Sequence, residues 1–205
     1  MSQADADADA GVNVCFAAIC DHLLIQQNIG GYGPHFNRTW EEFKHGFGNQ
    51  NDDYYWIGNE LLHRITNRNH YKVRFELQAR RPPISGQWFW AEYTQFRVLS
   101  EAKKYKLLVS GFSGNVSYDA FFWCNNVPFT TYDNENDFWN RGNCASRTGG
   151  GFWFGGCYQV GVNSARDTGC FRWYTMYKRK WDKTVMAVAA WEHDLQATRM
   201  WLECQ

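Results

Sequence analysis

The acidic segment at residues 133–144, DNENDFWNRGNC, has residue types and spacing that suggest cation binding. Asp133, Glu135 and Asp137 alternate, as the first three ligands of an EF-hand calcium loop do. An EF-hand also needs Gly at position six and a bidentate Glu at position twelve, where this chain has Phe138 and Cys144. The segment is therefore not an EF-hand. Two interpretations stay open: a calcium site built from carboxylates and main-chain carbonyls, or a polar loop without a metal.

Cysteines enclose the loop that follows this segment. Cys144 and Cys157 flank the Gly-rich stretch ASRTGGGFWFGG, which would hardly hold a shape without a cross-link. A disulfide between them would contribute about 3 kcal/mol in the chain-entropy account. The chain has 7 Cys, which favours an oxidising compartment and leaves at least one thiol free or paired between chains. The sequence does not fix the pairing of the others, which are Cys15, Cys20, Cys124, Cys170 and Cys204.

The other reactive residues form no catalytic constellation. In SGFSGN, Gly114 directly follows Ser113, whereas a nucleophile elbow needs an intervening residue and a strand-to-helix turn. The 6 His lack the H-x-x-x-H or H-x-H spacing that would indicate zinc. We therefore predict that the protein is not an enzyme. A hydrolase that uses Ser113 is the alternative from another class.

Charge and hydropathy limit the partners. Lys plus Arg and Asp plus Glu are balanced at 21 each, which gives no reason to expect nucleic acid or an anionic membrane surface as a partner. No run reaches the ~18 apolar residues that a membrane span requires. The apolar segment at residues 11–20 follows acidic residues, so no signal peptide is visible. The sequons at Asn37 and Asn115 nevertheless fit N-glycosylation of a secreted protein.

The elements that would position these residues indicate an α+β domain. Thr39 and Glu42 form a capping box, which predicts a short helix that ends at Gly46. A second short helix is expected after Asn59, through ELLHRIT. The segment YKVRFELQ alternates apolar and polar residues, which is typical of a half-buried strand of an antiparallel sheet. Two further strands, FWAEYTQFRVLS and KYKLLVSGF, are expected on either side of a polar turn at SEAKK.

Periodic patterns are absent from Ser113 to about Tyr174, where Gly, Asn, Asp and aromatic residues dominate. Such a long irregular stretch is uncommon unless it is functional or cross-linked. With 18% aromatic residues and 18 Gly, the chain can bury large flat side chains under irregular loops. Beyond this stretch, KTVMAVAAW at residues 183–191 predicts a returning strand, and residues 193–205 form a tail without an assignment. Residues 1–11 are an Ala/Asp-rich leader that we expect to be disordered.

The order of these motifs resembles the fibrinogen C-terminal domain family, which includes fibrinogen chains, ficolins, tachylectins, tenascins and angiopoietins. The motifs run from about Leu24 to Trp191 and are FNRTWEEFKHGFGN, YYWIGNELLHRIT, YKVRFEL, AEYTQFRVLSEAKKYKLLVSGFSGN, DAFFWCNNVPFTTYDNENDFWNRGNCA and GGGFWFGGC. The resemblance implies a small N-terminal part, a central antiparallel sheet with short helices, and an irregular part that carries calcium and ligand. We accordingly expect a single domain over residues 12–192, with the irregular binding part at about 113–180. The resemblance also implies that Cys144 pairs with Cys157.

The family's calcium loop places Asp at two alternate positions, adds two main-chain carbonyls and ends in G-N-C. The resemblance assigns these side chains to Glu135 and Asp137, one carbonyl to Gly142, and the other to Trp139 or Asn140. Glu135 departs from the family because Glu reaches one methylene further than Asp, and FWNR contains one extra residue. The resemblance therefore implies calcium as a cofactor, bound more weakly than in the family.

In the lectin members of the family, acetylated ligands bind beside this loop against a Cys-His peptide, typically in the cis form, and aromatic side chains close the pocket. The equivalent dipeptide here is Cys157-Tyr158, in which Tyr replaces His. Thr148 stands where an aromatic residue is common, and GFWF aligns with the family's G-W-W-Y. The implied ligand-binding residues are Cys157, Tyr158, Thr148, Phe152 and Trp153. Core packing is the alternative role for Phe152 and Trp153.

Two functions follow from the resemblance. The first is a secreted recognition module of the innate-immune lectin type, which binds carbohydrate or acetylated surface ligands with the assistance of calcium. The second is an interaction domain of the angiopoietin or tenascin type, which binds a receptor or matrix protein without lectin activity. Fibrin-type polymerisation is not expected, because the acidic and amide residues of the fibrinogen pocket correspond to Arg147 and Thr148. The sequence does not decide whether the chain forms a homo-oligomer.

Overall fold

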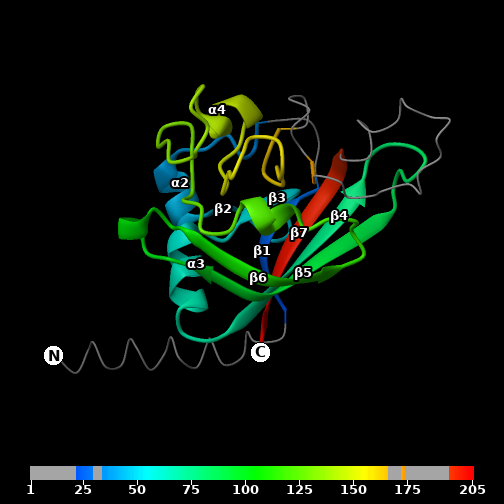
Figure 1. The fold of residues 1–205 in the computed structure, drawn as a ribbon, viewed down its shortest axis with the longest axis horizontal. Coiled ribbons are helices and arrows are strands. Elements are labelled where there is room, and N and C mark those ends of the chain that lie inside the picture. Colours follow the sequence, from blue (N-terminus) through cyan, green and yellow to red (C-terminus); the bar gives the residue numbers. More distant parts are fainter. Residues whose placement is uncertain (1–21, 30–33, 166–171, 174–193) are drawn as a thin grey trace.

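The computed structural model describes residues 22–29, 34–165, 172–173 and 194–205 (Figure 1). The predicted leader at residues 1–11 and the predicted strand at residues 183–191 lie outside these ranges, as do Cys15, Cys20 and Cys170.

A seven-stranded antiparallel sheet with the order β2-β3-β1-β7-β4-β5-β6 forms the centre of the fold. A few short helices accompany it, which confirms the α+β class. The strands are β1 (Leu23–Asn28), β2 (Phe47–Gly48), β3 (Tyr54–Trp56), β4 (Tyr71–Ala79), β5 (Trp88–Val98), β6 (Leu107–Gly114) and β7 (Leu195–Cys204).

Strand β7 occupies the middle of the sheet, between β1 and β4 (Figure 1). It comes from the C-terminal segment for which the sequence offered no assignment. Thr198 on this strand lies opposite Asn28 on β1 and Leu77 on β4. The strand is therefore defined by pairing with two segments that lie far away in the chain.

The elements with local sequence signals form as predicted. Thr39 Oγ1 accepts a hydrogen bond from Glu42 N, and the Glu42 side chain accepts one from Thr39 N, so the capping box opens helix α2 (Trp40–His45). Helix α3 (Asn59–Thr66) follows, and β4 alternates buried and half-buried residues along its length. Strands β5 and β6 form a hairpin through the 3₁₀ turn η1 (Glu101–Lys103). Of the helices in the described ranges, none is long and apolar enough to cross a membrane.

Aromatic rings join the irregular part of the chain to the helices and the sheet. Phe129 is completely buried, and its ring centroid lies 5.1 Å from that of Phe43 on α2, 6.0 Å from that of Trp56 on β3 and 5.1 Å from that of Trp153. Phe129 and Trp153 belong to the aperiodic stretch, whereas Phe43 and Trp56 belong to regular elements. The core therefore lies between the aperiodic stretch and the regular elements. Ring contacts of this kind add stability to that gained from burying apolar surface.

A buried polar network adds a second attachment. The Gln26 side chain on β1 donates to Val162 O at 3.2 Å and to Asn163 Oδ1 at 3.1 Å, and Asn28 donates to Val162 O at 3.2 Å. Gln26 also bonds to Thr198 on β7 at 3.0 Å. Polar groups inside a protein must be hydrogen-bonded because their desolvation is otherwise uncompensated, so these amides fix the position of residues 162–163 on the sheet.

We expect Phe129→Ala to lower the free energy of unfolding by about 3–5 kcal/mol, because it leaves a cavity among rings from both parts of the core. Phe138→Ala is the matched control: that side chain is 69% exposed. Its removal should change the stability by less than about 0.5 kcal/mol. Denaturant unfolding followed by tryptophan fluorescence measures both values. Similar losses for the two variants would contradict the central place given to Phe129.

Candidate ligand-binding site

The loop at residues 133–144 begins with a tether to helix α2. Asp133 Oδ1 accepts hydrogen bonds from Trp40 N at 2.9 Å and from Thr131 Oγ1 at 2.7 Å. Trp40 is the first residue of α2, where an unpaired backbone N–H and the helix dipole favour a carboxylate. The first acidic residue of the loop therefore anchors it to the helix.

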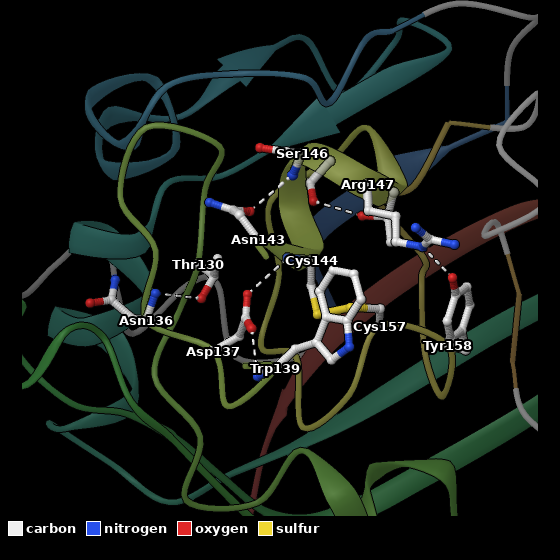
Figure 2. Close-up of a disulfide and its surroundings, with 12 residues drawn as sticks. Thr130, Asn136, Asp137, Trp139, Asn143, Cys144, Ser146, Arg147, Cys157 and Tyr158 are labelled. Atoms are coloured by element: carbon white, nitrogen blue, oxygen red, sulfur yellow. Dashed lines mark hydrogen bonds between the residues drawn. A yellow bond between two sulfur atoms is a disulfide. The ribbon is translucent and has the colours of Figure 1, made fainter. Parts of the chain in front are cut away.

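Asn136 holds the loop together by hydrogen bonds, because no strand or helix pairs the backbone there. Its side-chain amide donates to Phe129 O at 2.9 Å and to Asn134 Oδ1 at 3.0 Å. Its backbone N–H donates to Thr130 Oγ1 at 3.1 Å (Figure 2). Asn136 thus satisfies a backbone carbonyl that would otherwise lack a partner, and its own backbone N–H finds an acceptor in Thr130.

Asp137 connects the loop to the next helix, α4 (Cys144–Thr148). Its Oδ1 accepts from Trp139 N and its Oδ2 from Cys144 N, each at 2.9 Å (Figure 2). Asn143 caps α4, because its Oδ1 accepts from Ser146 N at 2.9 Å. Side chains of the loop therefore fix the start of α4 and the first half-cystine.

The disulfide predicted between Cys144 and Cys157 is confirmed, with the two Cα atoms 5.0 Å apart. Cys204 is also disulfide-bonded. Cys124 is a free, buried thiol whose pKa is raised to about 12, mainly because burial penalises the thiolate. Cys124 therefore stays protonated at neutral pH and is a poor nucleophile.

The carboxylates of the loop offer an incomplete set of metal ligands. Glu135 is exposed and makes no hydrogen bond or ion pair with another described residue. Asp137 already accepts one amide on each oxygen, although a carboxylate oxygen has a second lone pair. Within the described ranges, no three His, Cys, Asp or Glu side chains gather where they could hold a metal. A cation at this loop would thus need main-chain carbonyls, for which the expected residues are Trp139, Asn140 and Gly142.

The predicted ligand-binding residues differ in how far their side chains are exposed. The side chains of Thr148, Phe152 and Trp153 have no exposed surface and pack in the core, which is the alternative role that the sequence offers for Phe152 and Trp153. Cys157 is 4% exposed, whereas Tyr158 is 41% exposed. The Cys157-Tyr158 peptide is trans, since Pro82-Pro83 is the one cis bond among the described residues. Tyr158 is thus the predicted residue whose side chain a ligand can reach.

Arg147 was not among the predicted ligand-binding residues, although the family resemblance places it at a pocket position of fibrinogen. Its guanidinium carbon lies 5.4 Å from the ring centroid of Trp139 and 5.4 Å from that of Tyr158, and its Nε donates a hydrogen bond to the Tyr158 hydroxyl (Figure 2). Arg172 approaches the same tyrosine ring at 5.8 Å. One sequence signal could have placed Arg147 near Tyr158. Arg147 follows Cys144 by three residues, and Tyr158 directly follows the partner Cys157. The disulfide brings the two side chains together.

Comparison with known proteins agrees with this architecture. A family model described as the C-terminal globular domain of fibrinogen beta and gamma chains matches residues 20–204. The human fibrinogen alpha chain is 37% identical over 173 residues, which cover 75% of this chain and 19% of that relative. Human angiopoietin-related protein 2 is 38% identical over 134 residues, covering 65% of this chain and 26% of the relative. Human ficolin-3 is 36% identical over 141 residues, covering 69% and 45%. The matched region therefore spans less than half of each relative.

Solved structures show the same fold. The fibrinogen-like globe domain of human ANGPTL2 is 30% identical and superposes with a TM-score of 0.70, covering 90% of this chain and 84% of its own. A lamprey fibrin D-dimer, complexed with the peptide Gly-His-Arg-Pro-amide, gives a TM-score of 0.64 at 22% identity, covers 87% and 60%, and supports the fold alone. The chain therefore belongs to the family of fibrinogen C-terminal globular domains.

Proposed function

We propose that this chain is a secreted, non-enzymatic recognition module that binds surface glycans, acetylated ones among them, with calcium bound at the loop of residues 133–144. The observation that carries the proposal is the exposed Tyr158 ring, held beside Arg147 and Trp139 by the Cys144–Cys157 disulfide. Aromatic faces and a fixed guanidinium supply the stacking surface and the convergent polar donors that small ligands need. The similarity to human ficolin-3 supports this choice.

Several features favour recognition over catalysis. The fibrinogen-like domain is a recognition fold. Ser113 lies within strand β6, opposite Glu92, and no described histidine hydrogen-bonds to it. The Cys124 thiol is buried and protonated. Neither candidate nucleophile therefore has the activating base or the lowered pKa that covalent catalysis needs.

Secretion is proposed from the cysteines and the sequons. The disulfide between Cys144 and Cys157 and a second one at Cys204 need an oxidising compartment. Asn37 and Asn115 both lie on the surface, where a glycan can be attached.

A protein ligand is the second candidate function, and exposed aromatic residues favour it. Phe122 is 66% and Trp123 50% exposed, and their ring centroids lie 5.5 Å apart on the 3₁₀ helix η2 (Ala120–Trp123). Aromatic residues are enriched at protein interfaces. The similarity to angiopoietin-related protein 2 agrees with this alternative.

A glycan array probed in calcium and in chelator distinguishes the two functions. We expect hits on N-acetylated sugars in calcium and their loss in chelator. Tyr158→Ala should remove these hits because it deletes the exposed ring, whereas Trp88→Ala, which deletes a similarly exposed ring on β5, should retain them. An array without hits, together with binding to a cell-surface protein, would reject glycan recognition in favour of protein binding.

Calcium binding is tested by separating the structural and ligand roles of the two carboxylates. In chelator, Asp137→Ala should lower the free energy of unfolding by about 1–3 kcal/mol, because two backbone amides lose a charged acceptor. Glu135→Ala should stay within about 0.5 kcal/mol under the same conditions, since the side chain has no described partner. In calorimetric titration, the unmodified chain should take up calcium weakly and Glu135→Ala should not. No uptake by the unmodified chain at millimolar calcium would reject the calcium proposal.

A further inference from the structure

We propose that Arg147 binds the oxyanion of an acidic sugar, a carboxylate or a sulfate, so that the site selects charged glycans over neutral ones. This inference rests on the proposed glycan-binding function and names the chemical group that the site recognises. It is carried by the position of the guanidinium, the state of its hydrogen-bond donors and the charge around it.

The guanidinium is held in place before any ligand arrives. The rings of Trp139 and Tyr158 both lie 5.4 Å from its central carbon, and its Nε is engaged by the Tyr158 hydroxyl (Figure 2). The ring of Trp139 is a favourable environment for this weakly hydrated cation, and the Tyr158 hydroxyl holds it at the edge of the second ring. Tyr158 follows Cys157, and Arg147 lies one helical turn after Cys144, so the disulfide fixes their separation. The entropic cost of ordering a long side chain is therefore already met in the free protein.

The two terminal nitrogens of Arg147 are available to a ligand. Arg147 is exposed, and its Nη1 and Nη2 atoms make no hydrogen bond or ion pair with another described residue. Other arginines in the described part of the chain do have carboxylate partners, namely Arg38, Arg64, Arg74, Arg81 and Arg199. With Nε engaged, the Nη1–Nη2 edge presents two parallel N–H donors, which match the two oxygens of a carboxylate or two of a sulfate.

The surrounding charge also favours an anion. Asp137 directs its two oxygens to Trp139 N and Cys144 N, and Asp133 is bonded to Trp40 N, so neither forms an ion pair with Arg147. The guanidinium carbon of Arg172 lies 5.8 Å from the centroid of the Tyr158 ring. A cationic ligand would be repelled here, whereas a neutral acetyl group would leave the guanidinium charge unmatched.

The aromatic rings explain why the anion should belong to a sugar. Tyr158 is 41% exposed, so part of the ring beside the guanidinium stays open. A pyranose can place its C–H face on such a ring while its charged substituent reaches the Nη1–Nη2 edge. The site thus combines one directional contact with one apolar contact, as small-molecule sites do.

Calorimetric titration of the full chain in calcium and low salt tests the proposal with two matched pairs of probes. The first pair is the α-methyl glycoside of N-acetylneuraminic acid and its methyl ester, which keeps the acetyl group but removes the charge. The second pair is N-acetylglucosamine 6-sulfate and N-acetylglucosamine. We expect the charged member of at least one pair to bind about tenfold more tightly or better than its neutral partner, because a hydrogen bond to a charged group is worth that much. The first pair reports a carboxylate ligand, the second a sulfate.

Variants connect the preference to one side chain. Arg147→Gln should remove the difference in affinity within the responding pair, because the charged member loses the two N–H donors that its neutral partner does not use as an oxyanion does. Arg147→Lys should lose most of the preference for the charged sugar, because an ammonium lacks the two parallel N–H donors of a guanidinium. Arg141→Gln is the control, since it removes another exposed arginine of the loop and should keep the preference. Each variant is first checked by thermal unfolding against the unmodified chain.

Each outcome decides between the proposals. Equal binding within both pairs would overturn the oxyanion proposal and leave glycan recognition intact. A preference that survives in Arg147→Gln would also overturn it, because another group would then bind the anion. Failure of all four sugars to bind would overturn both proposals.

Discussion

The burial of aromatic rings between the sheet and the irregular part of the chain is the interaction on which the rest of the structure depends. Phe129 contacts Phe43, Trp56 and Trp153, and Trp153 donates through its indole N–H to Tyr105 O at 2.7 Å. A segment with few backbone ladders gains little stability from regular structure. Apolar burial of large rings must supply that stability instead.

This burial explains the glycines beside the rings. At Gly151, a Cβ atom would lie 2.6 Å from the Phe43 ring, so a larger residue would separate the segment from helix α2. Close approach by an irregular backbone also leaves N–H and C=O groups without ladder partners. Asp137 and Asn143 accept from such N–H groups, and Asn136 donates to such a carbonyl. The polar composition of the loop is therefore required by the apolar core beneath it, whether or not a cation binds.

Features that depend on residues close together in the sequence could be predicted, and features that depend on distant residues could not. The capping box at Thr39 and the alternation in β4 depend on neighbours a few residues away, and both were predictable. Strand β7 was not, because its buried Thr198 is polar and is satisfied by Gln26, far away in the chain. The disulfide was predictable from the glycine-rich loop that it closes. The exposure of ring side chains was not, since GFWF looks equally suited to a core or to a pocket.

The same distinction explains how the site can differ from its relatives while the fold is kept. Thr148 points into the core, and its neighbour Arg147 points out to Tyr158, so consecutive residues on α4 face the ring packing and the surface. Substitution at an inward position disturbs the ring packing, whereas substitution at an outward position changes the charge offered to a ligand. Because the Cys144–Cys157 disulfide fixes where these outward side chains meet, the recognition that we propose would depend on a few exposed residues displayed on a cross-linked frame.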